Sequence, residues 1–217
     1  MLAVLLTSIS VGAPRTACLR GDCVDGVGAF RWADGDSYSG SFKAGKPDGL
    51  GVFRADVGKA TQQRYAGAWS LGVRQGAGVL IFNDGRTYRG EFAKGKMEGY
   101  GVQSWTGEHR VARGYDTIAQ PGQFEGSFLD GVWSGKGRIT RGVKHPETGE
   151  DVSLSDEGVY LKGKLLSAED VPVAVETANA AAKMGEAQAK AAREAARSAN
   201  TLPLLAHSSA TEGEYEL

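Results

Sequence analysis

Residues 65–78 read Tyr65-Ala-Gly67-Ala-Trp69-Ser-Leu-Gly72-Val-Arg-Gln-Gly76-Ala-Gly78. The same arrangement of aromatic residues and glycines begins again at Tyr38, Tyr88 and Phe124, and a degraded copy begins at Asp156. The undisturbed spacing is 23 residues, from Tyr65 to Tyr88. A fixed period of this length indicates a repeat architecture, in which each copy is one supersecondary unit that stacks on its neighbours.

Each copy predicts a β-hairpin. Because alternate residues of a strand point to the same side, Tyr65, Gly67 and Trp69 share one face. Glycines at the first reversal and Asp-Gly pairs between copies supply the positive φ that short turns need. A single hairpin is marginal in water, so we expect the hairpins to stack and a ring to lie over a neighbour's glycine. The eight rings of the four full copies are Tyr38, Phe42, Tyr65, Trp69, Tyr88, Phe92, Phe124 and Phe128.

This pattern resembles the MORN repeat, a hairpin unit of about 23 residues with the consensus YxGxWxxGxxxGxGxxxxxDG. The resemblance covers residues 26–164. It implies an all-β repeat fold, an elongated single-layer antiparallel sheet with a groove lined by the aromatic-glycine face. It also implies a scaffold, an adaptor or a membrane-associated module. The fifth copy has Asp156 in place of the leading ring, so we interpret it as a degenerate terminal capping repeat. Whether its residues form a strand is in doubt.

The amino-terminal segment contains both cysteines. Residues 1–13 are apolar, end in small residues and resemble a signal peptide, although no basic residue precedes the apolar run. We expect export to the periplasm or cell envelope, with a cytoplasmic or peripheral membrane protein as the alternative. Residues 14–25 form a lead-in that carries Cys18 and Cys23. These cysteines close a small disulfide loop, worth roughly 2 kcal/mol by loop entropy, or remain two unpaired thiols.

The carboxyl-terminal segment, residues 165–200, is alanine-rich and predicts a helix. Its polar residues recur at steps of three and four from Glu176 to Arg197, which places them on one face. Pro172 marks a start and Pro203 a stop. The opposite stripe of small residues is thin, so we interpret the helix as a solvated spacer, with a partner-binding coiled coil as the alternative. We expect residues 201–217 to be disordered.

The sequence contains no recognisable catalytic motif. Three Gly-x4-Gly-Lys segments mimic half of a phosphate-binding loop, but each falls at the same turn of the repeat and lacks the following Ser or Thr. The three histidines have no ligand or base partner nearby in sequence. We therefore expect no enzyme activity, no cofactor and no metal. The formal net charge of −1 gives no argument for nucleic acid binding.

Two surfaces are candidates for binding. The first is the aromatic-glycine face, whose eight rings we expect to be exposed as a groove for a protein partner, although the same rings hold the hairpins together. Pairing through the sheet edges or the helix would give a homo-oligomer. The second is a basic patch on two long irregular connections, which suits an anionic phospholipid. Its residues are Arg110, Arg113, Arg138, Arg141 and Lys144.

Overall fold

The computed structural model describes residues 16–56, 63–107, 109–110, 117–118, 121–167 and 172–201. The predicted signal peptide and the predicted tail beyond Thr201 lie outside the described residues. In the part that is described, no helix is long and apolar enough to cross a membrane.

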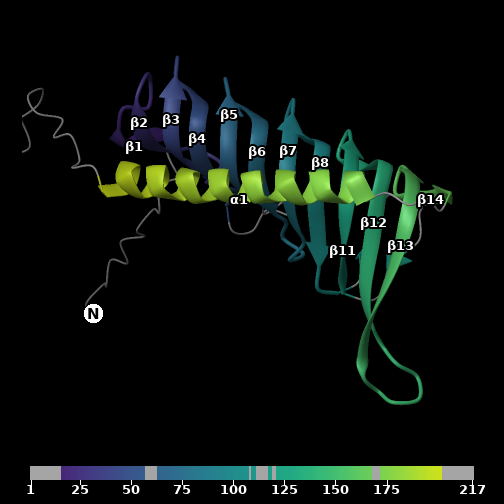
Figure 1. Cartoon of the computed structure of the whole chain (residues 1–217). Coiled ribbons are helices and arrows are strands. Elements are labelled where there is room, and N and C mark those ends of the chain that lie inside the picture. Colours follow the sequence, from purple (N-terminus) through teal and green to yellow (C-terminus); the bar gives the residue numbers. More distant parts are fainter. Residues whose placement is uncertain are drawn as a thin grey trace, which may run out of the picture.

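Twelve antiparallel strands form one open sheet in the order β1 to β8 followed by β11 to β14 (Figure 1). This architecture confirms the predicted array of stacked hairpins. The strands are β1 (Ala17–Gly21), β2 (Val27–Arg31), β3 (Ser37–Lys43), β4 (Lys46–Arg54), β5 (Arg64–Ser70), β6 (Val73–Ile81), β7 (Thr87–Ala93), β8 (Lys96–Trp105), β11 (Gly122–Leu129), β12 (Val132–Lys144), β13 (Asp151–Leu161) and β14 (Lys164–Ser167). A separate pair consists of β9 (His109–Arg110) and β10 (Thr117–Ile118).

The hairpins reverse over two residues that both have positive φ. In the β3–β4 turn, φ is 48° at Ala44 and 71° at Gly45. The other four turns of this kind are Leu71-Gly72, Lys94-Gly95, Asp130-Gly131 and Lys162-Gly163. Paired positive φ angles match the right-handed twist of the flanking strands, and glycine at the second position adopts them without steric cost. The segments that mimic a phosphate-binding loop end at three of these turns, which confirms their interpretation as turn residues.

The second of the two long connections, which carries Lys144 and was predicted to be irregular, is mostly strand. β12 and β13 pair continuously from Gly135 opposite Tyr160 to Lys144 opposite Asp151, and their hairpin projects beyond the rest of the sheet (Figure 1). Cross-strand ion pairs stabilise this extension, as described below. The doubted strand of the fifth copy also forms, because β13 continues into a hairpin with β14.

The lead-in predicted over residues 14–25 contains the first strand of a complete hairpin. β1 pairs with β2, with Cys18 opposite Phe30 and Gly21 opposite Gly28. In the next hairpin Tyr38 lies opposite Phe53 and Gly40 opposite Gly51, so Cys18 and Gly21 take the places of Tyr38 and Gly40, with one extra residue bulged between Cys18 and Arg20. The sequence hides this equivalence because the first hairpin has no ring on its first strand.

The helix α1 (Pro172–Thr201) begins at the predicted proline and lies across the sheet (Figure 1). The prediction that it is solvated is wrong. Ala178, Ala189 and Ala192 are fully buried, and the last two pack with Ala66 and Val79 on the face opposite the rings. Small side chains favour this contact because they let the helix backbone approach the sheet closely.

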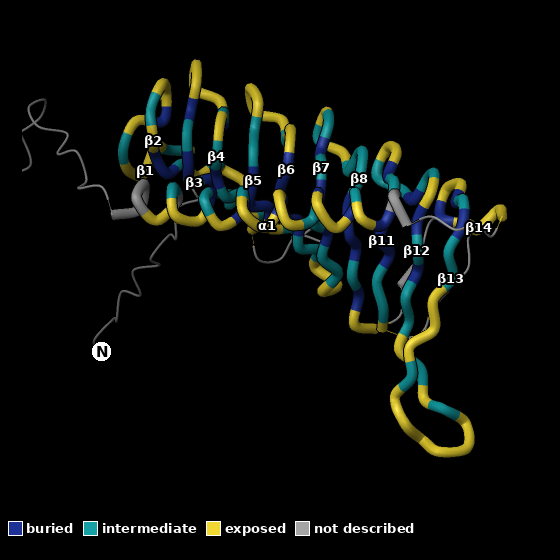
Figure 2. Tube along the Cα trace, in the orientation of Figure 1, coloured by how far each residue is buried: buried dark blue, intermediate teal, exposed yellow. Residues whose placement is uncertain are grey.

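Gly185 marks the closest approach of α1 to the sheet. A Cβ atom at this position would lie 2.7 Å from the carbonyl oxygen of Gly78 and 2.9 Å from the amide nitrogen of Gly90. An ion pair between Arg89 Nη1 and Glu186 Oε1, at 2.9 Å, flanks this contact. The helix therefore covers one face of the sheet, and Figure 2 shows the buried residues concentrated where the strands pass behind it.

Candidate interaction surface

The opposite face of the sheet carries a continuous ladder of nine rings. Consecutive ring centroids lie 4.8–5.4 Å apart and meet edge to face, alternately within a repeat and between repeats. The order along the ladder is Phe42, Tyr38, Trp69, Tyr65, Phe92, Tyr88, Phe128, Phe124 and Tyr160. Edge-to-face pairs are worth about 0.5–1.5 kcal/mol each beyond their burial. The ladder thus gives every repeat a specific contact with the next.

Each leading ring lies over a glycine of its own hairpin. A Cβ atom on Gly78 would meet the Tyr65 hydroxyl oxygen at 2.4 Å, and one on Gly51 would meet that of Tyr38 at 2.1 Å. The ring was predicted to lie over a neighbour's glycine. The observed partner is on the adjacent strand of the same repeat, because regular pairing sets Gly67 opposite Gly78 and Gly40 opposite Gly51, two positions along from each leading ring.

The ladder tyrosines keep hydrogen bonds within the buried face. The Tyr65 hydroxyl donates to the carbonyl oxygen of Ala68 at 2.9 Å, and the Tyr88 hydroxyl donates to that of Glu91 at 2.8 Å. Burial raises the pKa of both phenols above the ordinary value. Burial likewise raises the pKa of Tyr160, to about 12. The face therefore favours neutral phenols.

The prediction that the rings are exposed is wrong. Tyr38 and Tyr65 are 1% exposed, and Tyr88 and Phe124 are fully buried. Neighbouring ladder rings cover one another, and further side chains such as Trp133, which stacks on Phe124, complete the cover on this face. Of the eight predicted residues, Trp69 alone is more than slightly exposed.

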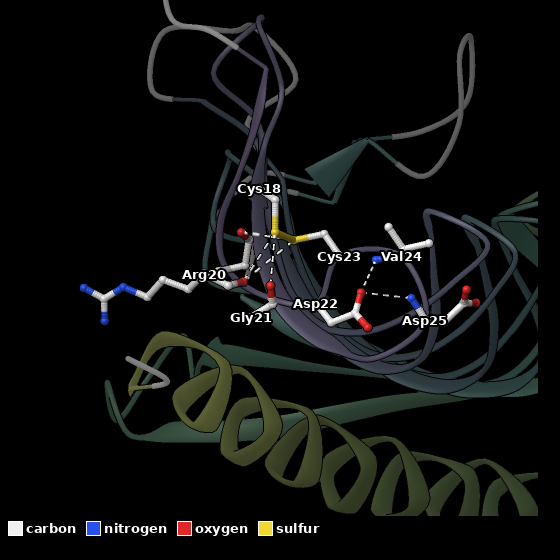
Figure 3. Close-up of a disulfide and its surroundings, with 8 residues drawn as sticks. Cys18, Arg20, Gly21, Asp22, Cys23, Val24 and Asp25 are labelled. Carbon is white, nitrogen blue, oxygen red and sulfur yellow. Dashed lines mark hydrogen bonds between the residues drawn. A yellow bond between two sulfur atoms is a disulfide. The ribbon is translucent and has the colours of Figure 1, made fainter. Parts of the chain in front are cut away.

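The disulfide closes the amino-terminal end of the ladder. Cys18 and Cys23 are joined, with their Cα atoms 5.9 Å apart, which confirms the disulfide alternative (Figure 3). The register places Cys18 where Tyr38 stands in the next hairpin. Cys23 is buried in one cluster with Tyr38 and Phe42. A covalent link thus occupies the place of a ring pair.

An open cavity of about 420 Å3 lies beside Trp69 on the ring side of the sheet. We call it the Trp69 groove. It is lined by the aromatic side chains of Trp32, Phe53, Tyr65 and Trp69, and by Gly45, Lys46, Pro47, Gln63, Gly72 and Arg74. The groove therefore combines apolar walls with two cationic side chains.

Arg74 is the unusual member of this lining. The repeat places Pro47, Met97 and Trp133 at the equivalent position, opposite the second ring of each hairpin. The Arg74 guanidinium carbon lies 5.7 Å from the ring centroid of Tyr65 and 5.6 Å from that of Phe92.

One guanidinium nitrogen, Nη2, donates to the carbonyl oxygen of Gly95 at 2.7 Å. Burial lowers the pKa of Arg74. Among the residues that the structure describes, no carboxylate forms an ion pair with it. Arg74 was not predicted as a site residue. The other copies have apolar residues at this repeat position, so the charged side chain was the sequence signal that could have identified it.

The predicted basic patch is largely neutralised. Arg138, Arg141 and Lys144 lie on β12, and each forms an ion pair across to β13. Their partners are Glu157, Asp156 and Asp151, respectively, and the Lys144 pair measures 2.6 Å. The patch was expected on an irregular loop, where the acidic residues would be free to point away. Antiparallel register instead sets Glu157 opposite Arg138 and Asp151 opposite Lys144, and it brings Asp156 diagonally within reach of Arg141.

The structure does not describe the side chains of the other two predicted patch residues. Arg113 and the side chain of Arg110 lie outside the described residues. Within the described ranges, no group of three or more acidic, histidine or cysteine side chains is arranged to hold a metal ion.

Comparison with known proteins agrees with the repeat pattern. The family model of the MORN repeat matches residues 25–37, 38–58, 65–85, 88–110 and 124–142. A search of curated proteins found no match.

Proposed function

This chain belongs to the MORN repeat family, and we propose that it is a non-catalytic scaffold that binds a protein partner in the Trp69 groove. MORN repeats are generally scaffolds for interaction with proteins or lipids. Most of the ladder rings are buried by packing against one another. The partly exposed Trp69 therefore supports the groove as the binding site most strongly.

The chemistry of the groove suits a polypeptide segment. Apolar and aromatic walls with a few polar groups are typical of recognition sites, and tryptophan, tyrosine and arginine are the residues that most often dominate binding energy. Trp69 and Arg74 face each other in the register of β5 and β6. They therefore form the centre of the proposed contact.

The carboxyl-terminal edge of the sheet is a second candidate for partner binding. All four residues of β14 are exposed, and Leu166 is 59% exposed. Leu161 and Leu165 add further exposed apolar surface at this edge. An exposed edge strand with apolar side chains favours pairing with a strand of another chain, including a second copy.

Affinity capture from native extract tests the proposal and separates the two surfaces. The bait is the full chain, compared with Trp69→Ala in the groove and Leu166→Ser at the edge. Groove binding predicts that a specific partner is lost with Trp69→Ala and retained with Leu166→Ser. Recovery that is unchanged by Trp69→Ala, with circular dichroism showing a folded chain, would remove the groove. A loss confined to Leu166→Ser would transfer the function to the edge.

A phospholipid-binding module is the alternative function. The ion pairs of β12 with β13 leave little free positive charge on the described part of the predicted patch. Sedimentation with vesicles at low ionic strength decides this point. Lipid binding requires that the chain pellets with anionic vesicles, does not pellet with neutral ones, and is released as salt rises. The scaffold proposal predicts no pelleting with either.

We also propose that the chain is exported to an oxidising compartment. The disulfide supports this location, because such bonds persist in secreted and periplasmic proteins and are rare in the cytosol. Thiol labelling of protein from rapidly acidified cells provides the test. Export predicts that Cys18 and Cys23 resist labelling until a reductant is added, and immediate labelling of both would contradict it.

A further inference from the structure

We propose that the Trp69 groove binds the acidic segment Glu212–Leu217 of this same chain, so that partner binding is regulated by competition. The inference rests on the proposed function of the groove. Its physical basis is the combination of a half-buried cation, aromatic walls and an acidic, aromatic segment within reach.

The first step concerns charge. A guanidinium carries five N–H donors, and the described contacts of Arg74 engage one of them in a hydrogen bond. Removing this group from water is unfavourable unless an anion or further acceptors compensate it. Lys46 lines the same cavity and adds a second positive charge. A carboxylate in the groove would thus be stabilised by two cations.

The second step concerns shape. Trp32, Phe53 and Trp69 line the groove, and the ring centroids of Trp32 and Trp69 each lie 6.2 Å from that of Phe53. An aromatic or large aliphatic side chain suits this surface, because ring contacts are favourable beyond their buried area. The groove therefore selects a segment in which a carboxylate adjoins such a side chain.

The third step concerns the occupant. Residues 212–217 read Glu212-Gly-Glu-Tyr215-Glu-Leu217. They alternate glutamates with a glycine, a tyrosine and a leucine, and residues 202–217 contain no lysine or arginine. Both requirements of the groove, the carboxylate and the neighbouring apolar side chain, are met within this one stretch.

The fourth step concerns reach. The carboxyl-terminal end of α1 lies beside β1 and β2 (Figure 1), and the groove begins at Trp32, directly after β2. Neighbouring strands are about 4.8 Å apart, so the distance from β1 to β6 across the sheet is roughly 25 Å. Residues 202–211, which connect α1 to the proposed segment, span at most about 35 Å when extended. The segment is long enough to pass around the β1 edge and enter the groove.

The experiment is a fluorescence polarisation titration with a labelled peptide of sequence Glu-Gly-Glu-Tyr-Glu-Leu. The full chain is compared with a variant carrying Glu212→Gln, Glu214→Gln and Glu216→Gln. Because the variant's own segment no longer competes, we expect it to bind the peptide at least tenfold more tightly than the unaltered chain. Adding Arg74→Met to the variant should weaken binding at least tenfold, and a peptide with glutamines in place of glutamates should not bind.

Arg74→Met is chosen because Met97 already occupies the equivalent position in the next repeat. Equal peptide affinity for the unaltered chain and the triple variant would overturn the regulation. Peptide binding that is unaffected by Arg74→Met, or no binding to the triple variant, would overturn the recognition chemistry. Loss of the captured partner with Trp69→Ala, in the absence of any peptide binding, would leave the proposed function intact and eliminate this inference alone.

Discussion

The phenol ring of Tyr65 lies against the α-carbon of Gly78 on the adjacent strand, where no Cβ atom fits. The would-be Cβ of Gly78 is 2.4 Å from the Tyr65 hydroxyl oxygen and 2.6 Å from two ring carbons. This contact recurs along the sheet, between Tyr88 and Gly101 and between Phe124 and Gly137. The glycines of the repeat are therefore needed for space as well as for turns.

Gly78→Ala is expected to lower the free energy of unfolding by about 1–3 kcal/mol, because the added methyl displaces the Tyr65 ring from the ladder. Urea denaturation monitored by circular dichroism measures the change. Gly107→Ala is the control, because a Cβ atom there meets nothing within 4 Å. Equal midpoints for the two variants would contradict the role of this contact.

Replacing Cys18 and Cys23 with serine is expected to cost about 2 kcal/mol of loop entropy and to open the amino-terminal end of the ladder. Hydrogen exchange should accelerate in β1 to β3 and remain unchanged in β11 to β14, because within the sheet each repeat contacts only its neighbours. Uniform acceleration across the sheet would show that the disulfide acts globally, contrary to this view of its place in the ladder.

Gly185→Leu is expected to separate α1 from the sheet, because the side chain would collide with the backbone of Gly78 and Gly90. Limited proteolysis should then cut within α1, whereas the unaltered helix resists. Met184→Leu is the matched control, since Met184 is 52% exposed. A helix that stays protected after Gly185→Leu would contradict the close approach.

Alkaline pH is expected to unfold the array through its tyrosines. The pKa of Tyr160 rises from 10.0 to about 12 on folding, and the pKa values of Tyr38, Tyr65 and Tyr88 are also raised. A raised pKa means that the folded state holds the proton more tightly, so stability is complete below about pH 10 and falls as pH rises from there.

Absorbance of tyrosinate and circular dichroism, followed through the same alkaline titration, check this prediction. The ionisation of the ladder tyrosines should coincide with loss of the sheet signal. Full ionisation of every tyrosine near pH 10 with an intact sheet would contradict the buried ladder.

Much of the fold is predictable from local chemistry. The ring and glycine spacing predicts the hairpins, and Pro172 predicts the start of α1. The burial of α1 was missed because an alanine stripe has little hydrophobic surface, and its packing depends on the close approach at Gly185, which involves strands distant in sequence. The strands of the fifth copy were doubted because Asp156 replaces a ring, yet Tyr160 still extends the ladder.

The candidate site was harder to predict. The repeat pattern predicted which side chains share a face, but their exposure depends on contacts between repeats that a single copy does not display. The prediction of a free basic patch was wrong for a similar reason. The ion-pair partners of Arg138 and Arg141 come from a strand whose register the sequence did not reveal. Arg74 was readable only by comparing the same position across copies.

The most direct test of the ring ladder is a double-mutant cycle on Tyr88 and Phe128, whose rings meet across two consecutive repeats with centroids 4.8 Å apart. Tyr88→Leu, Phe128→Leu and the double variant are compared by urea denaturation. The ladder predicts a coupling free energy of about 0.5–1.5 kcal/mol for this pair and none for Tyr38 with Phe128, which do not touch. Strictly additive losses for Tyr88 and Phe128 would contradict the claim that ring contacts join one repeat to the next.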